Sequence, residues 1–291
     1  MDLSPGQLDA LVAIAEFGSF EAAARELHIT PSAVSQRIRA LEAAAGQVLV
    51  SRSAPCRPTV HGERLVRLGR QTRLLYDEAG AAIAAAPAVE LPVAVNADSL
   101  VSWFRDVLAA VAGWDGTALR LHVEDQAYSH KLLRSGDVLA AVTSDPEAVQ
   151  GCSVEPLGSL RYVPAATPAL ADRWRRGSAP DWAAMPTIVF NDKDYLQEEL
   201  LRRHGVPETP PVVHRVPASA DFCAAVVLGL GWAMLPEIQA GADLAAGRLV
   251  RLSDDVIDVP LFWQRWRLDS PRLTALTDAV RVAARTHLPR A

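Results

Sequence analysis

The chain is 291 residues long and half of its residues are apolar, which is enough hydrophobic side chain for about two packed domains. Charged residues make up 22%, so the composition excludes a disordered or fibrous chain. Three cysteines without a CxxC spacing exclude a disulfide scaffold, argue against a thiolate zinc site and favour a reducing compartment. The acidic N-terminus has no signal-peptide pattern and no apolar run reaches the roughly 18 residues that span a bilayer, so we expect a cytoplasmic protein.

The net charge of −5 is unevenly distributed along the chain. Residues 1–87 carry nine arginines and nine acidic residues, so the negative excess lies entirely in residues 88–291. Within the neutral part, residues 25–57 carry five arginines against Glu26 and Glu42. A locally positive segment inside an acidic protein can bind DNA without the general basicity of a non-specific binder.

The spacing of apolar residues predicts three short helices at the N-terminus, over residues 5–17, 20–27 and 31–45. Ser19 and Thr30 each stand directly before a helix, where a hydroxyl can accept a hydrogen bond from a free backbone N–H. The last two helices and the three-residue turn between them have the order of a helix-turn-helix.

The third predicted helix has two chemically different faces. One face is apolar, with Val34, Ile38 and Leu41, and the opposite face has no acidic residue. Glutamine can pair bidentately with adenine and arginine with guanine, and small side chains let a helix approach the base edges. An ordinary solvated face is the alternative, and it would usually carry Glu and Lys. The candidate base-reading residues are Ser32, Ala33, Ser35, Gln36 and Arg39.

Residues 48–59 predict a two-stranded wing around a proline-rich turn. Arg52 and Arg57 lie in this wing, where they would meet phosphates or a minor groove. The wing therefore extends the candidate DNA-binding surface beyond the helix.

Residues 60–85 predict one long helix. Its small and apolar residues follow the 3-4-3-4 spacing of a coiled-coil seam, at Leu65, Leu68, Thr72, Leu75, Ala79 and Ala82. Packing on its own domain is the alternative. Because the helix joins two domains and has little else to bury against, we favour a homodimer whose two heads bind two half-sites of a dyad-symmetric promoter site.

The segment FGSFEAAARELHITPSAVSQRIRALEAAAGQVLVSR, residues 17–52, followed by PTVHGERLV, resembles the winged helix-turn-helix of LysR-type transcriptional regulators. One departure is His61, where the family usually has alanine, and it lies outside the base-reading face. The resemblance implies a dimer. We expect a tetramer built as a dimer of dimers, and we count RNA polymerase as a candidate partner.

From Leu91 onward, short apolar runs alternate with helical ones, first up to Thr143 and again from Thr187 to Leu235. This order predicts an α/β fold with an open parallel sheet. Two lobes crossed twice by the chain resemble a periplasmic-binding-protein fold of type 2. We therefore expect a DNA-binding domain over 1–59, a dimerising linker helix over 60–87 and an effector-binding domain over 88–291, with lobe I at about 91–162 and 268–291 and lobe II at about 163–267.

Polar residues follow the ends of the predicted strands, where open α/β sheets bind ligands. Ser99 and the free N–H groups of a helix suit a carboxylate, whereas Asp98, or Glu124 with Asp125, suits an ammonium or guanidinium group. Each such residue alone could simply cap a helix. Together the strand ends favour a cationic amino acid, and they supply Asn96, Asp98, Ser99, Glu124, Asp125, Thr143, Phe190 and Asp192.

The segments VNADSLVSWF, VEDQ, LLRSGDVLAAVTSDPEAVQGCSVEPLGSLRY and ATPAL resemble the branch of LysR-type regulators that senses lysine or arginine and controls an exporter of these amino acids. The resemblance implies an effector site that also includes Trp103. Arg161 is either a hinge ion-pair partner or a second hook for a carboxylate, and both alternatives stay open.

Catalytic and metal-binding signatures are missing from the sequence. The seven histidines form no HxH or HExxH, and there is no GxSxG elbow or P-loop. We therefore expect no enzyme, no metal and no cofactor. The alternatives to an amino-acid-sensing regulator are an architectural DNA-binding protein without an effector, a regulator that senses a different small molecule, and an enzyme or solute-binding module that uses the α/β domain alone.

Overall fold

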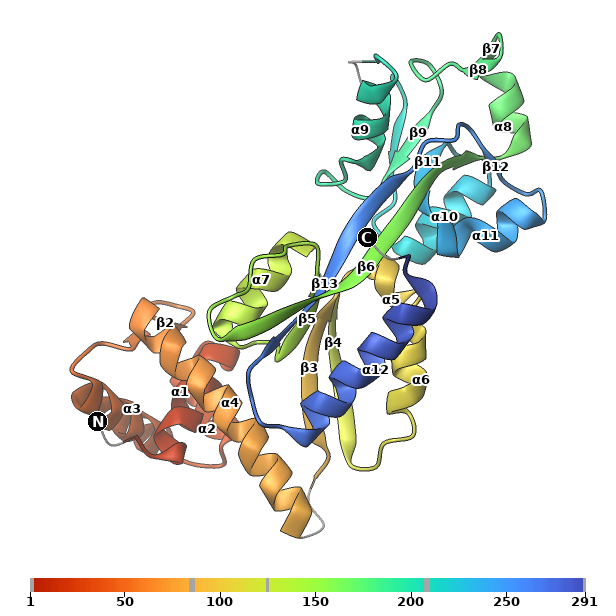
Figure 1. Cartoon of the computed structure of the whole chain (residues 1–291). Helices are drawn as coiled ribbons and strands as arrows, with labels where there is room; N and C mark the ends of the chain where they lie inside the picture. The colour runs from red at the N-terminus through yellow and green to blue at the C-terminus, as the bar shows by residue number, and fades with distance from the viewer. Residues whose placement is uncertain (1–2, 84–86, 124–125, 207–209, 290–291) are drawn as a thin grey trace.

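A computed structural model describes residues 3–83, 87–123, 126–206 and 210–289. The chain forms a small helical head, one long linker helix and two α/β lobes that share a sheet (Figure 1). The predicted fold class, an α/β protein with an N-terminal winged helix-turn-helix, is confirmed. No helix in these ranges is long and apolar enough to cross a membrane.

The head contains α1 (Pro5–Phe17), α2 (Phe20–Glu26), α3 (Pro31–Ala45) and a wing of β1 (Val50–Ser51) and β2 (Arg57–Pro58). Ser19 Oγ accepts a hydrogen bond of 3.0 Å from the backbone N–H of Ala22, and Thr30 Oγ1 accepts one of 3.1 Å from that of Ala33. Both predicted caps are therefore present. They start α2 and α3 where the apolar faces of these helices can pack on α1.

The linker helix α4 (Val60–Ile83) has three faces: one packs on the head, one packs on lobe I and one is exposed. Gly62 and Gly69 lie against the head, Leu74 is buried in the core of lobe I, and Leu68 and Leu75 remain about 40% exposed. The expectation that this helix has little to bury against within its own chain was wrong, because the stripe through Leu74 packs on lobe I. The predicted seam through Leu68 and Leu75 is a separate face that stays accessible.

One sheet runs through both lobes in the order β11-β6-β13-β5-β3-β4, with β12 beside β6. The three strands β3, β4 and β5 pair in parallel, as predicted, whereas β6 and β13 are antiparallel and extend from one lobe to the other. The strands are β3 (Val89–Val95), β4 (Thr117–Val123), β5 (Ala140–Thr143), β6 (Cys152–Ala166), β11 (Ala233–Pro236), β12 (Val250–Arg251) and β13 (Ile257–Trp266). The sheet is therefore mixed. The sequence pattern missed β6, because Pro156, Gly158 and Pro164 interrupt its alternation.

The helices cover the sheet on both faces (Figure 1). Lobe I contains α5 (Ala97–Leu100), α6 (Arg105–Val111), α7 (Gln126–Ser135) and α12 (Pro271–His287). Lobe II contains α8 (Pro168–Arg173), β7 (Arg175–Arg176), β8 (Ala179–Pro180), β9 (Thr187–Val189), α9 (Leu196–Arg203), β10 (Val213–Arg215), α10 (Ser219–Val227) and α11 (Glu237–Ala245). The helical stretch that follows β3 is interrupted, and its two pieces are α5 and α6.

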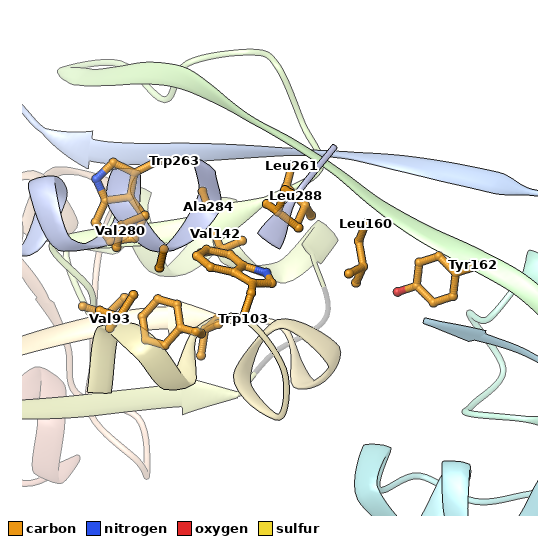
Figure 2. Close-up of a cluster of buried hydrophobic side chains, with 14 of the residues drawn as sticks. Val93, Trp103, Val142, Leu160, Tyr162, Leu261, Trp263, Val280, Ala284 and Leu288 are labelled. Carbon is orange, nitrogen blue, oxygen red and sulfur yellow. The ribbon is translucent and has the colours of Figure 1, made fainter. Parts of the chain in front are cut away.

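Alternate residues of β3 supply the two layers of lobe I. Val93 and Val95 join the cluster under α6 and α12, whereas Ala94 joins the cluster under α7. Figure 2 shows Trp103 in the first cluster, next to Val142 and Ala284. This packing fixes the end of β3, and with it the start of α5, at the edge that faces lobe II.

We predict opposite effects for two glycine-to-alanine changes in α4. A Cβ on Gly62 would lie 2.1 Å from the backbone oxygen of Leu49, whereas one on Gly80 would meet nothing within 4 Å. Gly62→Ala should lower the free energy of unfolding by about 1–3 kcal/mol, because the helix must move away from the wing. Gly80→Ala should raise it by about 0.4–1 kcal/mol, because alanine restricts the unfolded chain. Urea unfolding measures both, and equal effects would contradict the close approach at Gly62.

Candidate functional site

The head exposes the predicted base-reading face of α3. Val34 and Ile38 are fully buried, whereas Ser32, Gln36 and Arg39 are exposed on the opposite side. The small residues Ala33 and Ser35 lie half-buried between them. The arrangement leaves a hydroxyl, an amide and a guanidinium accessible on one helix face, as direct base readout requires.

The wing is attached to the C-terminal half of α3 through Glu42. Its Oε1 atom accepts hydrogen bonds from the backbone N–H groups of Leu49, at 2.9 Å, and Val50, at 3.4 Å. Arg52 lies over the ring of Phe20, with 5.7 Å from Cζ to the ring centroid, and Arg57 is exposed on β2. The carboxylate of Glu42 is thus engaged by backbone N–H groups, and both wing arginines reach the surface.

A cavity of about 560 Å³ lies between the two lobes. Lobe I contributes Asn96 and Asp98, which follow β3, and lobe II contributes the loop before α9. The crossing strands contribute Tyr162 from β6 and Val259 from β13. The cavity is therefore formed by segments that only the two-lobed fold brings together.

Asp98 connects lobe I to the rest of this cavity. Its Oδ2 atom accepts a hydrogen bond of 2.7 Å from the hydroxyl of Tyr162, and Oδ1 accepts one from the hydroxyl of Ser219 at the start of α10. The amide of Gln239 on α11 donates to Ser219 Oγ at 3.3 Å. Burial and the Asp98 carboxylate raise the pKa of Tyr162 well above its ordinary value, so the tyrosine stays protonated and donates. One carboxylate thus holds the two lobes together.

Asp194 places a second carboxylate in the same cavity. Its oxygens accept hydrogen bonds from the backbone N–H groups of Phe190, at 2.8 Å, and Leu196, at 3.3 Å. Burial raises the pKa of Asp194 in spite of these bonds, and the charge of Asp98 adds to the effect. The raised pKa of Asp194 thus reflects first its burial and then the nearby charge of Asp98.

Two further charged residues line the wall of the cavity, Lys193 and Glu199. Glu199 is paired with Arg203 at 3.0 Å and also with Arg202, so its charge is compensated on α9. The described lining therefore has one cation, Lys193, and two carboxylates at the junction of the lobes, Asp98 and Asp194. These two carboxylates suit a ligand group that carries a positive charge and several N–H donors.

Two family models match the chain. Residues 5–63 match the bacterial regulatory helix-turn-helix protein of the lysR family, and residues 84–285 match the LysR substrate binding domain. The chain belongs to the LysR family of transcriptional regulators. It is therefore a DNA-binding regulator with an effector-binding domain and not an enzyme.

Two relatives are similar to this chain over nearly its full length. The chain is 48% identical over 288 residues to the lysine export transcriptional regulatory protein LysG of Corynebacterium efficiens, covering 98% of this chain and 99% of the relative. The structure of ArgP from Mycobacterium tuberculosis has a TM-score of 0.89 at 44% identity, covering 100% of both chains.

Two structures of LysG from Corynebacterium glutamicum also match. The one with the bound effector Arg has a TM-score of 0.85 at 45% identity, covering 98% of this chain and 99% of that chain. The other has a TM-score of 0.65 at 44% identity, covering 99% and 100%. The two structures of this relative therefore differ in how closely they match this chain.

The structure brings three predicted effector residues into the LysR-family cleft, namely Asn96, Asp98 and Phe190. Three others lie behind its wall: Ser99, Trp103 and Thr143 are buried in lobe I. The hydroxyl of Ser99 has no hydrogen-bond partner among the described residues. Glu124 and Asp125 lie outside the part of the chain that the structure describes.

Two further predicted effector residues lie outside the cavity. The side chain of Asp192 is 85% exposed and pairs with Arg215 at 3.0 Å, so the lining carboxylate of this loop is Asp194 instead. Arg161 lies within β6, and its two hydrogen bonds of 2.8 Å to Asp258 on β13 lower the pKa of that carboxylate. The structure therefore favours the hinge ion pair over a carboxylate hook.

Sequence reasoning missed Tyr162, Ser219 and Gln239. Tyr162 directly follows Arg161, and its only available signal was its place in a strand that the pattern did not reveal. Ser219 and Gln239 carry no signal of their own, because each depends on how lobe II closes on Asp98. Asp194 was within the sequence segment considered, two residues beyond the one chosen.

We predict that Tyr162→Phe lowers the free energy of unfolding by about 1.5–3 kcal/mol, the range for hydrogen bonds to charged groups. The hydroxyl is buried and donates to the Asp98 carboxylate. Tyr195→Phe is the matched control, because Tyr195 lines the same cavity but is 64% exposed, and it should change stability by less than about 0.5 kcal/mol. Urea unfolding of both variants checks this, and equal losses would contradict a special role for the buried hydroxyl.

Proposed function

We propose that this LysR-family regulator responds to lysine or arginine, bound in the cleft between the lobes. The observation that carries the proposal is the pair of carboxylates, Asp98 from lobe I and Asp194 from lobe II, that line one cavity. A side-chain ammonium or guanidinium placed between them would compensate both charges. The similarity to LysG with bound Arg and to a lysine export regulator supports the same ligand class.

The same site offers groups for the carboxylate end of an amino acid. The hydroxyl of Ser99 is buried just behind the cavity wall and has no partner among the described residues, so it can donate to a carboxylate oxygen. The unpartnered Oδ1 atom of Asn96 is an acceptor and would instead accept from an N–H of the α-ammonium group. We assign the α-carboxylate to Ser99 and the cationic groups to Asp98 and Asp194.

We further propose that the three parts of the chain have the functions that the sequence predicts. Residues 1–59 bind DNA, residues 60–87 dimerise, and residues 88–291 bind the effector in two lobes. The base-reading residues are Ser32, Ala33, Ser35, Gln36 and Arg39, and Arg52 and Arg57 contact the backbone or a minor groove. The accessible face of these side chains supports this assignment.

The proposed partners follow from this architecture. The exposed stripe through Leu68 and Leu75 supports a homodimer built on α4, and we extend this to a tetramer that binds a dyad-symmetric promoter site in the cytoplasm and contacts RNA polymerase. The names of the relatives support a target gene for amino acid export. The ligand can regulate only by binding one arrangement of the chain better than another.

We predict that Gln36→Ala or Arg39→Ala weakens binding to the cognate promoter site by about 1–3 kcal/mol and relaxes base preference there. Both side chains are exposed on the reading face of α3. Arg57→Ala is the control for a backbone contact, and it should weaken binding to cognate and random duplexes alike. Fluorescence anisotropy at physiological salt measures all three variants. Equal losses on both duplexes for Gln36→Ala would show that this residue does not read bases.

We predict that Asp98→Asn weakens lysine and arginine binding at least about tenfold, because a charge-assisted pair is replaced by a neutral one. The matched control is Asp192→Asn, since Asp192 is in the other lobe, 85% exposed and outside the cavity. Isothermal titration of the full chain with lysine, arginine and leucine measures the affinities. Binding of leucine as tight as that of lysine, or an unchanged affinity in Asp98→Asn, would refute the proposed ligand class.

A further inference from the structure

One guanidinium group of the linker helix contacts both lobe I and the head. Arg70 pairs with Asp137 at 2.7 Å and donates to the backbone oxygen of Ser135 at 3.1 Å, at the turn that follows α7. The same guanidinium reaches Glu16 of α1 in the head at 3.5 Å. Its side chain is only 14% exposed. Arg70 thus contacts the head and lobe I at the same time, from the helix that lies between them.

One turn earlier in α4, Arg67 makes a second contact with the same turn of lobe I. It donates to the backbone oxygen of Arg134 at 3.4 Å and lies over the ring of Trp266, 4.9 Å from its centroid. A Cβ built on Gly136 would lie 3.1 Å from the Cα of Arg67, and Gly136 has a φ of +77°. The turn therefore approaches the helix as closely as a glycine backbone allows.

Trp266 connects this contact to the effector cleft. It is the last residue of β13, the crossing strand whose Val259 lines the cavity. Its ring is buried with Leu133 and Val138, on the face of lobe I that α7 covers. The strand that lines the cavity at one end thus carries the ring beneath Arg67 at the other.

The C-terminal half of α4 is anchored separately. Leu74 is buried in the lobe I core, and Glu78 accepts hydrogen bonds from Ser270 Oγ at 2.7 Å and from the backbone N–H of Arg272 at 3.1 Å. This half can remain attached to lobe I when the contacts of Arg70 are lost. The N-terminal half of α4 contacts lobe I through Arg67 and Arg70, and of these two Arg70 also contacts the head, through Glu16.

We propose that Arg70 is a positioning residue that sets the orientation of the DNA-reading head on lobe I. The two heads of a dimer then have the correct orientation for two half-sites before DNA binds. Binding at two linked sites gains most when the linkage is already in the correct geometry. The proposal rests on the DNA-binding function of the family and on the proposed homodimer, but not on the proposed ligand, and its test therefore uses no effector. The two structures of the relative LysG match this chain with TM-scores of 0.85 and 0.65, a difference between those structures that an adjustable junction would permit.

The experiment compares the full-length chain with Arg70→Gln and Asp137→Asn on two duplexes. DNase I footprinting of the region upstream of the chain's own gene defines the protected site, and a second duplex carries this site with one half scrambled. Arg70→Gln should weaken binding to the intact site about fivefold or more and binding to the scrambled site less than about twofold. The double variant should lose no more than Arg70→Gln alone, because the pair between Arg70 and Asp137 is already absent in that single variant.

Arg120→Gln is the matched control, because Arg120 pairs with Glu90 at 3.1 Å within lobe I and leaves the junction intact. Sedimentation checks that all variants keep the same oligomeric state. If Arg70→Gln fails to fold, Asp137→Asn carries the test. The Asp137 side chain is 36% exposed, so its replacement by asparagine disturbs the fold less.

A direct readout accompanies the affinities. Hydrogen exchange should accelerate in residues 133–138 and in the N-terminal half of α4 when Arg70 or Asp137 is replaced, and should stay unchanged in Arg120→Gln. Selective loss on the intact site together with faster exchange supports the proposal. Equal loss on both duplexes, no loss on either, or additive losses in the double variant would each overturn it.

Discussion

The antiparallel pairing of β6 with β13 is the constraint on which the cleft depends. These strands pair from Cys152 with Trp266 to Tyr162 with Ile257, and so they carry the chain from one lobe to the other as one ribbon. Arg161 and Asp258 face each other across this ribbon and add a bidentate ion pair near the cavity. Because both partners are about 40% exposed, the ion pair itself adds little stability, and the backbone ladder supplies the rigidity.

The chemistry of the cleft follows from charges that the fold brings close together. Asp98 and Asp194 come from different lobes and line one cavity, and burial desolvates Asp194. Tyr162 and Ser219 donate to Asp98, and two backbone N–H groups donate to Asp194, so hydrogen bonds offset part of the cost of placing these carboxylates there. Under the proposed function, a cationic ligand would favour the arrangement of the lobes that brings both carboxylates to it, which is the difference in affinity that a ligand needs to shift a population of states.

Local signals in the sequence predicted what depends on neighbours along the chain. The caps at Ser19 and Thr30, the apolar face with Val34, and the exposed Gln36 need only helical periodicity and capping chemistry. The site in the cleft was predicted less well, because it depends on pairing between distant segments. Trp103 lies between α5 and α6 and Thr143 is the last residue of β5, and both are buried inside lobe I. The lining carboxylate is Asp194 rather than Asp192, because the loop folds back to give Asp194 the backbone N–H groups of Phe190 and Leu196.

The linker helix shows why a periodic pattern does not identify its partner. A straight helix can carry several stripes at the same spacing, and α4 uses one against the head, one against lobe I and leaves one exposed. The seam through Leu68 and Leu75 was visible in the sequence as apolar residues, whereas the stripe through Arg70, Leu74 and Glu78 was not, because charged residues supply two of its contacts. Such polar contacts stabilise a docked helix less than a buried apolar seam does. The ion pair of Arg70 or the hydrogen bonds of Glu78 can therefore break and re-form at a smaller cost in free energy. The helix thus combines an apolar face suited to a lasting partner with a polar face suited to a junction that changes.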